Sequence, residues 1–584
     1  MKSIGSELNQ LGDFDRRPSV AVLGGGVGGL TAAHELRQRG FDVTVYEMRD
    51  AFGGKARSMP VPDSGTDGRA DLPAEHGFRF FPGFYRHLDD TMGRIPYGQG
   101  RVVDHLVPAS ATLLAQAGRR NELIVPTAMP SSLMDFALIG QFMWDFGVRL
   151  RVPPWELAFL AERIFTLLIS CDERRFEQWE RTSWWDYTCA DMLSETFQKF
   201  LADGPTRSLV AAQAREMSTR TGGLIMCQLL FDMMGGGGHL DRVLDGPTSE
   251  VWIEPWRAHL QGRGVELRTG CEVTEIHCDG RSITGVAVKG AAEPITADYY
   301  VAALPVERLI RLVSDAMREA EPRLGRLDQL TTRWMSGVMF YLDRDVRLQR
   351  GHAIFMDSPW ALTAISQAQF WPEINLEHRG DGSVDGILSV DVSDWERPGK
   401  RGLMAMECTE DEICEEVWQQ IVDHIDDGSL ARNNVLKCFL DPSIQWPNPT
   451  NIVNLEPLLI NTAGSWDNRP DAVTNIHNFF LAADFVRTYT DLATMEGANE
   501  AARRAVNGIL NETRSDEPHC EVWKLREPRV LAPLRKLDRL RWQLERPVKS
   551  SIGMTAAGAL ELTGLLARGL RTAARLGQVR RTPD

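Results

Sequence analysis

The stretch VAVLGGGVGGLTAAHELRQRGFDVTVYEMRDAFGGKARS, residues 20–58, decides the fold of this 584-residue chain. The apolar run Val20–Leu23 enters a glycine-rich turn, and apolar residues then recur at helical spacing. A second apolar run follows and ends at Glu47. This order predicts a strand, a helix and a second strand in a unit that binds a dinucleotide.

The glycines of this turn have separate expected roles. Gly24 permits a tight turn, Gly26 lets the backbone approach a pyrophosphate, and Gly29 lets the helix pack closely on the strand. Glu47, 18 residues beyond Gly29, is placed to accept hydrogen bonds from an adenosine ribose. A glycine pattern alone is weak evidence, whereas the complete order is specific. Gly28 and Met48 are the other residues of this stretch that are expected to contact the dinucleotide.

The next residues favour FAD over NAD. Residues 49–58, RDAFGGKARS, resemble the R-x-x-x-G-G-[KR]-x-x-S continuation of flavoproteins related to amine oxidases and phytoene desaturases. We interpret Gly53 and Gly54 as a second glycine turn beside the diphosphate, with Lys55 and Arg57 supplying positive charge. The alternative is an ordinary glycine loop with solvated basic residues.

A segment near the other end resembles the C-terminal FAD signature of the same superfamily. It reads NFFLAADFVRTYTDLATMEGANEAARRAVNGIL, residues 478–510. The resemblance implies that Asp484 holds the ribityl chain or a phosphate, and that Met495, Glu496 and Gly497 lie against the isoalloxazine. One position departs from the family: Ala483 stands where a glycine is usual, so its methyl group is either accommodated or shifts the cofactor.

Three further matches run in family order. EHGFRFFPGFY, residues 75–85, resembles a segment of plant- and cyanobacterial-type phytoene desaturases, and places Gly77 near the flavin. Residues 244–276 and 297–305 resemble the segments that return to the FAD domain, and Val273 is implied to line the adenine pocket. The chain is therefore similar to the phytoene desaturase-like branch of the flavin amine oxidase superfamily.

The expected architecture is α/β. A discontinuous, Rossmann-like FAD-binding domain covers about 18–100, 240–310 and 470–512. An α+β substrate domain fills the gaps, with 101–239 mainly helical and 311–469 mixing helix with strand, and 513–584 form a basic helical tail. The Gly235–Gly238 run lacks the Lys-Ser/Thr of a phosphate loop and is interpreted as a lid or linker.

Composition limits the class of protein. The nine cysteines form no C-x-x-C pair, so neither a zinc site, nor any other metal site, nor a disulfide framework is expected. The net charge of −15 and the absence of a nucleic-acid motif argue against nucleic-acid binding. The Arg16-Arg17 pair precedes an apolar run too short for a twin-arginine signal. A reducing cytoplasm is the expected location, with peripheral attachment to the inner face of the membrane as an extension.

Two regions raise the question of lipid contact, although no stretch is long and apolar enough to span a bilayer. Residues 133–169 predict two amphipathic helices joined by a turn at Pro153-Pro154. These helices either face the core or form an interfacial patch where substrate enters. Residues 524–584 carry 14 Lys/Arg and 5 Asp/Glu, a net charge of +9, so they either bind an anionic membrane surface or pack on the acidic body.

The resemblance implies an FAD-dependent oxidoreductase, a desaturase, that moves a hydride from a hydrophobic, isoprenoid-like substrate to flavin N5. His76 and Arg79 are the candidate catalytic side chains, with Glu75 beside them. The sequence does not identify the bond that is oxidised or the final electron acceptor, a quinone or O2. The rivals are a flavin amine oxidase, a flavin-assisted isomerase and a non-enzymatic lipid carrier.

Overall fold

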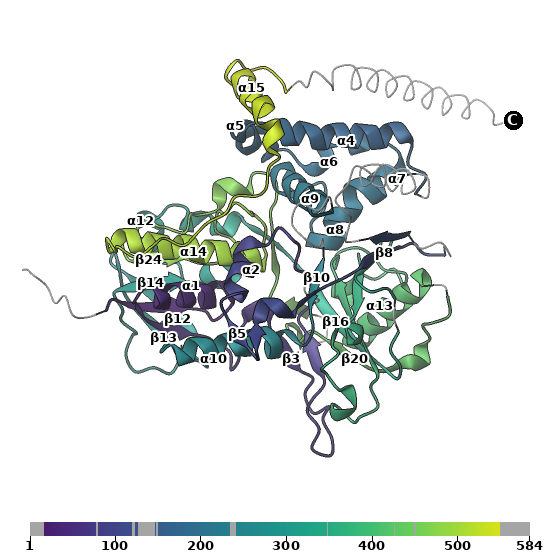
Figure 1. Ribbon diagram of the computed structural model, residues 1–584, viewed down its shortest axis with the longest axis horizontal. Helices are drawn as coiled ribbons and strands as arrows, with labels where there is room; N and C mark the ends of the chain where they lie inside the picture. Colours follow the sequence, from purple (N-terminus) through teal and green to yellow (C-terminus); the bar gives the residue numbers. More distant parts are fainter. Residues whose placement is uncertain are drawn as a thin grey trace, which may run out of the picture.

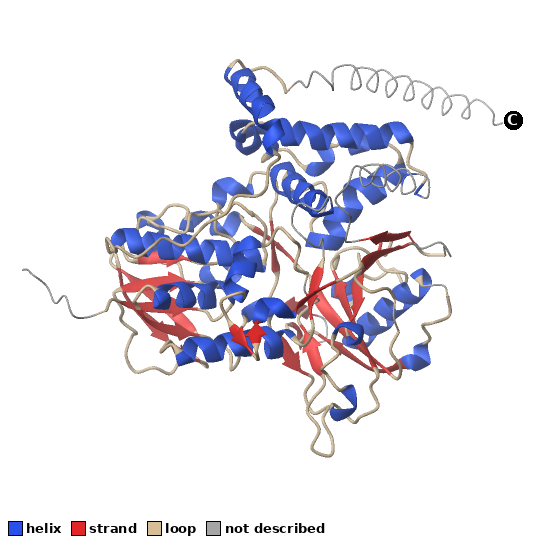
Figure 2. Ribbon diagram, viewed as in Figure 1, coloured by secondary structure: helices blue, strands red, loops and turns tan. Residues whose placement is uncertain are grey.

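A computed structural model describes residues 17–77, 80–118, 123–126, 147, 150–233, 241–346, 348–425, 427–448 and 451–548. Two sheets lie side by side, and a layer of helices covers them at one end (Figures 1 and 2). The prediction of an α/β fold is confirmed.

The first sheet contains the predicted dinucleotide-binding unit. Its order is β11-β2-β1-β14-β24, and all neighbours are parallel. The strands come from four distant parts of the chain: β1 (Ser19–Leu23), β2 (Asp42–Tyr46), β11 (Glu266–Arg268), β14 (Tyr299–Ala302) and β24 (Phe479–Leu481). Because the carboxyl ends of parallel strands share one edge, the glycine turn after β1 and the segment after β24 meet there.

Two helices lie side by side on this sheet. Helix α1 (Val27–Gln38) follows the glycine turn, and α14 (Met495–Glu512) opens at the predicted Met-Glu-Gly-Ala. Asn499 of α14 donates from its side-chain amide to the Thr31 hydroxyl of α1 at 3.0 Å, and a Cβ at Gly28 of α1 would lie 3.5 Å from the Ala498 carbonyl oxygen, so the two helices approach closely. The sequence prediction of both helices is confirmed.

The second sheet has seven strands in the order β20-β16-β19-β18-β17-β8-β9. Its bounds are β8 (Ala111–Ala115), β9 (Leu123–Pro126), β16 (Ser336–Leu342), β17 (Ala353–Phe355), β18 (Thr363–Ser366), β19 (Gly386–Val392) and β20 (Val435–Leu440). Only β17 and β8 pair in parallel. The region 101–239 is thus less helical than predicted at its start, since its alternating run 111–115 enters this sheet.

Shorter strands and helices connect these layers. The strand pairs are β3 (Ser58–Pro60) with β4 (Pro73–Glu75), β5 (Pro96–Tyr97) with β6 (Gly100–Arg101), β7 (Leu106–Pro108) with β10 (Arg242–Leu244), β12 (Val273–Cys278) with β13 (Ile283–Val288), β15 (Thr331–Arg333) with β23 (Leu458–Ile460), and β21 (Ile444–Asn448) with β22 (Asn451–Asn454). The shorter helices near the first sheet are α2 (Arg86–Met92), α10 (Glu254–Gly262), α11 (Val306–Leu309) and α12 (Asp315–Ala320), and α13 (Glu410–His424) packs on the second sheet.

The helical layer contains α4 (Pro154–Ile169), α5 (Asp172–Arg174), α6 (Trp184–Tyr187), α7 (Glu195–Phe197), α8 (Gly204–Val210) and α9 (Thr219–Met233). Its core includes the fully buried Trp184 and Phe197. Helix α4 is the second of the two helices predicted in 133–169, and it begins directly after Pro153. The first of those helices and the Gly235–Gly238 run lie outside the described residues. No helix in the described ranges is long and apolar enough to cross a bilayer.

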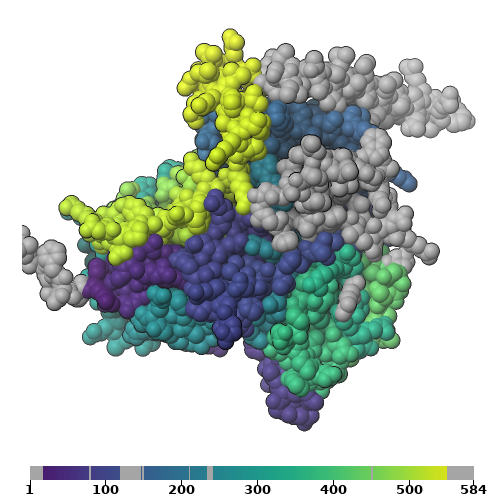
Figure 3. Space-filling model, in the orientation of Figure 1, coloured from purple at the N-terminus to yellow at the C-terminus, as the bar shows by residue number. Residues whose placement is uncertain are grey.

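The described part of the basic tail packs on the protein rather than extending from it. The Trp523 backbone N–H donates to His87 Nε2 at 2.9 Å, and Arg526 exchanges backbone hydrogen bonds with the Gln228 side chain. The tail then forms α15 (Ala532–Gln543) against the helical layer. Figure 3 shows this segment, in yellow, extending over the surface from the lobe of the first sheet to the helical layer.

One disulfide joins Cys414 on α13 to Cys438 on β20. Sequence analysis expected no disulfide framework, and this single bridge departs from that expectation. The two cysteines are 24 residues apart with no recognisable spacing, and they meet only because α13 packs on β20.

Candidate active site

A single cavity of about 920 Å³ runs from the glycine turn of the first sheet to the face of the second. Its volume is close to the upper end of the roughly 300–1,000 Å³ typical of ligand pockets. Twelve of the predicted cofactor residues line it: Gly24, Gly26, Gly28, Glu47, Met48, Gly53, Gly54, Lys55, Gly77, Val273, Asp484 and Met495. The fold therefore gathers segments up to 470 residues apart around one space.

Three glycines of the first turn differ in how much space surrounds them. A Cβ at Gly28 would lie 2.0 Å from the Ala482 carbonyl oxygen, and one at Gly29 would lie 1.9 Å from the Gly24 carbonyl oxygen. These two glycines are required by the packing of α1 on its neighbours, and Gly29 does not line the cavity. At Gly26 the nearest atom to a Cβ would be the Gly54 Cα, 3.7 Å away. Gly26 therefore leaves open space that belongs to the cavity.

Glu47 occupies the position expected of a ribose acceptor. Its side chain is almost completely buried, and its carboxylate accepts hydrogen bonds from the backbone N–H of Gly25 at 2.7 Å and of Arg49 at 2.9 Å. An ionised carboxylate has about four lone-pair sites, so two backbone donors leave capacity for ribose hydroxyls. The carboxylate thus fixes the glycine turn and still faces the cavity.

The second glycine turn lies directly against the first. The Gly53 N–H donates to the Gly25 carbonyl at 2.8 Å, and both Gly53 and Gly54 have positive φ angles, of 106° and 57°. Arg57 is buried against this turn, where its guanidinium donates to the Gly54 carbonyl and to Glu456. It does not line the cavity, so its observed contacts hold the loop.

Lys55 does line the cavity, and it forms an ion pair with Glu307 at 2.9 Å. Burial raises the pKa of Glu307, and Lys55 opposes that shift. Two further cations, Arg308 and Arg311, line the same region beside the predicted x-x-Pro turn. The sequence pattern predicted the turn but did not indicate that these two arginines would line the cavity.

The segment after β24 forms the opposite wall. Asp484 and Ala483 line the cavity, as does Met495 at the first position of α14. Thr494 caps this helix, because its hydroxyl accepts a hydrogen bond from the Gly497 N–H at 3.1 Å. The helix N-terminus, which carries partial positive charge, is therefore directed at the cavity wall.

Glu496 and Gly497 are not among the lining residues. Both Glu496 carboxylate oxygens are used at the start of α2, where they accept from the backbone N–H groups of Arg86, His87 and Leu88. An acidic side chain at a helix N-terminus satisfies donors that the helix itself leaves unpaired. A Cβ at Gly497 would lie 2.5 Å from the Leu492 carbonyl oxygen. The observed contacts of these two residues are structural.

Of the predicted catalytic candidates, His76 reaches the cavity. Its Nδ1 faces Asp441 and lies 3.7 Å from Glu456 Oε2. Glu456 in turn pairs with Arg57 and Arg49, and these cations together with His76 lower its pKa to about 2 although burial opposes them. His76 is therefore part of a charge network that connects the glycine loops to the second sheet. Arg79 lies outside the described residues.

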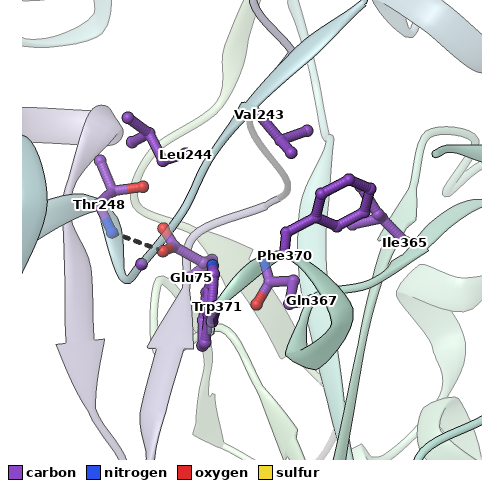
Figure 4. Close-up of a pocket in the computed structure, with 9 residues that line it drawn as sticks. Glu75, Val243, Leu244, Thr248, Ile365, Gln367, Phe370 and Trp371 are labelled. Atoms are coloured by element: carbon purple, nitrogen blue, oxygen red, sulfur yellow. Dashed lines mark hydrogen bonds between the residues drawn. The ribbon is translucent and has the colours of Figure 1, made fainter. Parts of the chain in front are cut away.

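Glu75 lies in a different, much smaller pocket of about 20 Å³ (Figure 4). Its carboxylate accepts a hydrogen bond from the Thr248 N–H at 2.9 Å, and Phe370 and Trp371 surround the pocket. The pocket has space for about one water molecule. Glu75 is therefore a positioning group for the loop that contains Thr248, not a residue of the large cavity.

The other half of the cavity is mostly apolar and was not predicted residue by residue. Helix α9 and neighbouring segments supply Trp184, Met217, Ile225, Met226 and Leu229, and the second sheet supplies Thr112, Leu114, His352, Ile354, Thr363 and Asp391. The side chain of Asp391 directly abuts Gly77. Sequence patterns indicated the strands but not which of their faces would meet the glycine segments.

Comparison with known proteins agrees with this geometry. Residues 27–510 match the family model of flavin-containing amine oxidoreductases. A zeta-carotene desaturase of Synechocystis sp. is 25% identical over 517 residues, covering 85% of this chain and 98% of the relative. A 15-cis-phytoene desaturase of Synechococcus elongatus is 23% identical, covering 85% and 96%. The solved cyclohexylamine oxidase of Brevibacterium oxydans shares the fold, with a TM-score of 0.58, 13% identity and coverage of 85% and 100%.

The residues present fit a flavin dinucleotide. The open space beside Gly26, the remaining acceptor capacity of Glu47 and the helix N-terminus at Met495 all border the one cavity. Backbone N–H groups and a helix terminus suit phosphates and an electron-rich ring. Ala483, at the position where the sequence resemblance implies glycine, also borders this space.

Proposed function

Because the chain belongs to the family of flavin-containing amine oxidoreductases and is an FAD-dependent oxidoreductase, we propose that it dehydrogenates a hydrophobic, isoprenoid-like chain. One observation carries this proposal: the cofactor end of the cavity continues without a break into an apolar chamber between α9 and the second sheet. The similar cyanobacterial proteins are named as carotene and phytoene desaturases, which supports a substrate of that class.

FAD, when bound, supplies a two-electron acceptor for a hydride. The chain's own residues bind the cofactor and exclude water. The backbone at Gly26 would face the pyrophosphate, Glu47 would accept from the ribose, and Asp484 would hold the ribityl chain or a phosphate. Apolar side chains such as Ile225 and Met226 would position the substrate and keep the chamber dry. Lys55 would contribute positive charge, shared with Glu307.

The first test is reduction of the bound flavin without oxygen. We expect a polyene from a hydrophobic lipid extract to bleach the flavin absorbance and to yield a product two hydrogens lighter. NADPH alone should not bleach it, because residues 20–58 contain the one dinucleotide fingerprint of the sequence and FAD occupies it. Rapid bleaching by NADPH would contradict the proposal and indicate a reductase or monooxygenase. A product of unchanged mass would indicate an isomerase.

The amine oxidase alternative makes a different prediction, namely H2O2 release from amines. Amine oxidases often use a lysine–water relay near N5. Among the described residues that line the cavity, Lys55 is the only lysine, and it pairs with Glu307 beside the second glycine turn. This observation favours a hydrocarbon substrate over an amine.

We further propose that α15 docks the protein on an anionic membrane. Asp538 faces the protein core, whereas Leu537, Leu540 and Leu544 project outward with exposed fractions of 46%, 58% and 65%. They share one helical face, and the exposed Lys536 and Arg539 accompany them. Basic amphipathic helices of this kind suit an anionic lipid surface, from which a lipophilic substrate could enter.

The membrane proposal predicts the behaviour of a triple variant, Leu537→Gln/Leu540→Gln/Leu544→Gln. Its co-sedimentation with anionic lipid vesicles should fall about tenfold or more at low salt, since each leucine loses on the order of 1 kcal/mol of burial in lipid. FAD absorbance should be unchanged. Leu436→Gln, at a leucine exposed on β20, is the control and should sediment like the unmodified protein. Equal sedimentation of the triple variant would exclude α15 as the anchor.

A further inference from the structure

A buried histidine–aspartate pair lines the apolar half of the cavity, apart from the His76 network. His352 Nδ1 lies 2.5 Å from Asp241 Oδ2, and the two residues are 5% and 1% exposed. Both residues line the same cavity as the glycine turns. A buried polar pair in a mostly apolar chamber has a high desolvation cost, so its presence there calls for a chemical explanation.

The second sheet positions His352, and the β7–β10 strand pair positions Asp241. His352 directly precedes β17, and its carbonyl accepts a hydrogen bond from the Leu113 N–H at 2.8 Å. Asp241 directly precedes β10, and its carbonyl accepts from the Ala109 N–H at 3.1 Å. The Phe80 ring packs edge-on against the His352 ring, with centroids 5.7 Å apart. Both side chains are therefore positioned by strands rather than by free loops.

The carboxylate defines the state of the imidazole. With Asp241 accepting at Nδ1, the neutral ring carries its proton on that nitrogen, and the lone pair lies on Nε2, at the opposite edge of the ring. A carboxylate that orients a histidine in this way also stabilises the imidazolium formed when Nε2 takes up a proton. We propose that His352 is the catalytic base of the dehydrogenation and that Asp241 is its positioning residue, an assignment that rests on the proposed function.

His76 is less suited to this role, although it was the sequence-based candidate. Its ring faces the two carboxylates of Asp441 and Glu456, and Glu456 is itself held by two arginines. The ring is thus committed to a network that connects separate loops. His352 faces the carboxylate of Asp241 and borders the mostly apolar half of the cavity.

The atoms and electrons of the proposed dehydrogenation balance when FAD, the cofactor of the family, is the hydride acceptor. One carbon of the substrate gives up a hydride, two electrons and a proton together, to oxidised FAD. The neighbouring carbon loses a proton to His352 Nε2, and the electron pair of that C–H bond becomes the second bond of the new double bond. General-base assistance of this kind contributes typically 10²–10⁴-fold to a rate. The proton then leaves His352 as the site opens to solvent for product release.

The first arm of the test compares rates of product formation at full FAD occupancy. His352→Gln preserves a polar side chain beside Asp241 but cannot accept the proton, so we expect the rate to fall roughly 10²–10⁴-fold with visible flavin absorbance unchanged. His105→Gln is the control, because His105 pairs with Asp245 at 2.9 Å outside the cavity, and it should retain the original rate. A rate for His352→Gln within about threefold of the unmodified protein would overturn the assignment.

The second arm needs no substrate, so it separates this assignment from the proposed function. Nitrogen-15 NMR of labelled histidine, with His352→Gln to identify the signal, should show that the neutral ring of His352 carries its proton on Nδ1. Asp241→Asn should change that tautomer while flavin absorbance is retained. A permanently charged His352 would overturn the base assignment even if dehydrogenation is observed. If the expected tautomer is found in a protein that dehydrogenates no polyene, the geometry assigned to His352 and Asp241 is supported. The proposed substrate class is then refuted instead.

Discussion

Gly26→Val should give a folded, colourless protein. A Cβ at this position would meet nothing closer than 3.7 Å, and the Gly26 φ of −76° is accessible to any amino acid. The added side chain should therefore not disturb the apoprotein. It would instead occupy the space that the pyrophosphate needs, where close approach of the backbone is required. We expect flavin absorbance to be lost completely while circular dichroism and the melting temperature of the apoprotein stay unchanged.

Other glycines distinguish this effect from a loss of fold. Gly29→Ala would place a Cβ 1.9 Å from the Gly24 carbonyl oxygen, so it should lose flavin because the turn itself cannot form. Gly262→Ala, on α10, has no heavy atom within 4 Å of the added Cβ and should remain yellow and stable. A Gly26→Val protein with normal flavin absorbance would show that the cofactor does not cross this turn.

The sequence correctly predicted the structural elements that depend on a local pattern. The turn at Gly24 and Gly26, the acidic end of β2 at Glu47 and the start of α14 at Met495 are each defined by a few adjacent residues. Their chemistry is contained in spacing and in glycine's conformational freedom, so a single sequence is enough to predict it.

Contacts between distant segments could not be predicted in this way. Arg57 was expected to face a phosphate, yet Glu456 lies 3.2 Å from its guanidinium after a separation of 399 residues. His352 and Asp241 are 111 residues apart and meet only because β17 and β10 begin near each other. Such pairs depend on which face of a strand is turned inward, and no periodicity in the chain specifies that choice.

The tail illustrates the same limit. Its charge of +9 left open whether residues 524–584 bind an anionic membrane surface or pack on the acidic body. The structure places Asp538 of α15 in a buried position, 3% exposed, against Arg174 of α5. One aspartate among many basic residues gave no sequence signal of its importance. A cut at Lys524 would remove this partner, so point variants are the appropriate test of the tail.

Asp538→Ala should release α15 from the protein. The Asp538 carboxylate accepts hydrogen bonds from the Arg174 guanidinium at 3.0 Å and from the Cys171 N–H at 2.9 Å. Removing it would leave a buried arginine without its counter-charge, which typically costs about 3–5 kcal/mol. Because α15 lies near the end of the described chain, we expect it to detach before the sheets unfold. Hydrogen exchange in residues 532–543 should become fast. Trypsin should cut there at protease concentrations to which the unmodified chain is resistant.

The matching control is the exposed pair between Arg539 on α15 and Glu173 on α5, whose side chains are 50% and 40% exposed. Glu173→Ala should leave exchange and proteolysis unchanged, because water already screens that pair. Asp538→Asn retains hydrogen-bonding atoms but not the charge, so its effect should lie between those of the other two variants. FAD absorbance should persist in all three, since the cofactor wall ends with α14. Protection of α15 in Asp538→Ala equal to that of the unmodified protein would show that its leucine and tryptophan contacts, rather than the buried ion pair, hold the helix in place.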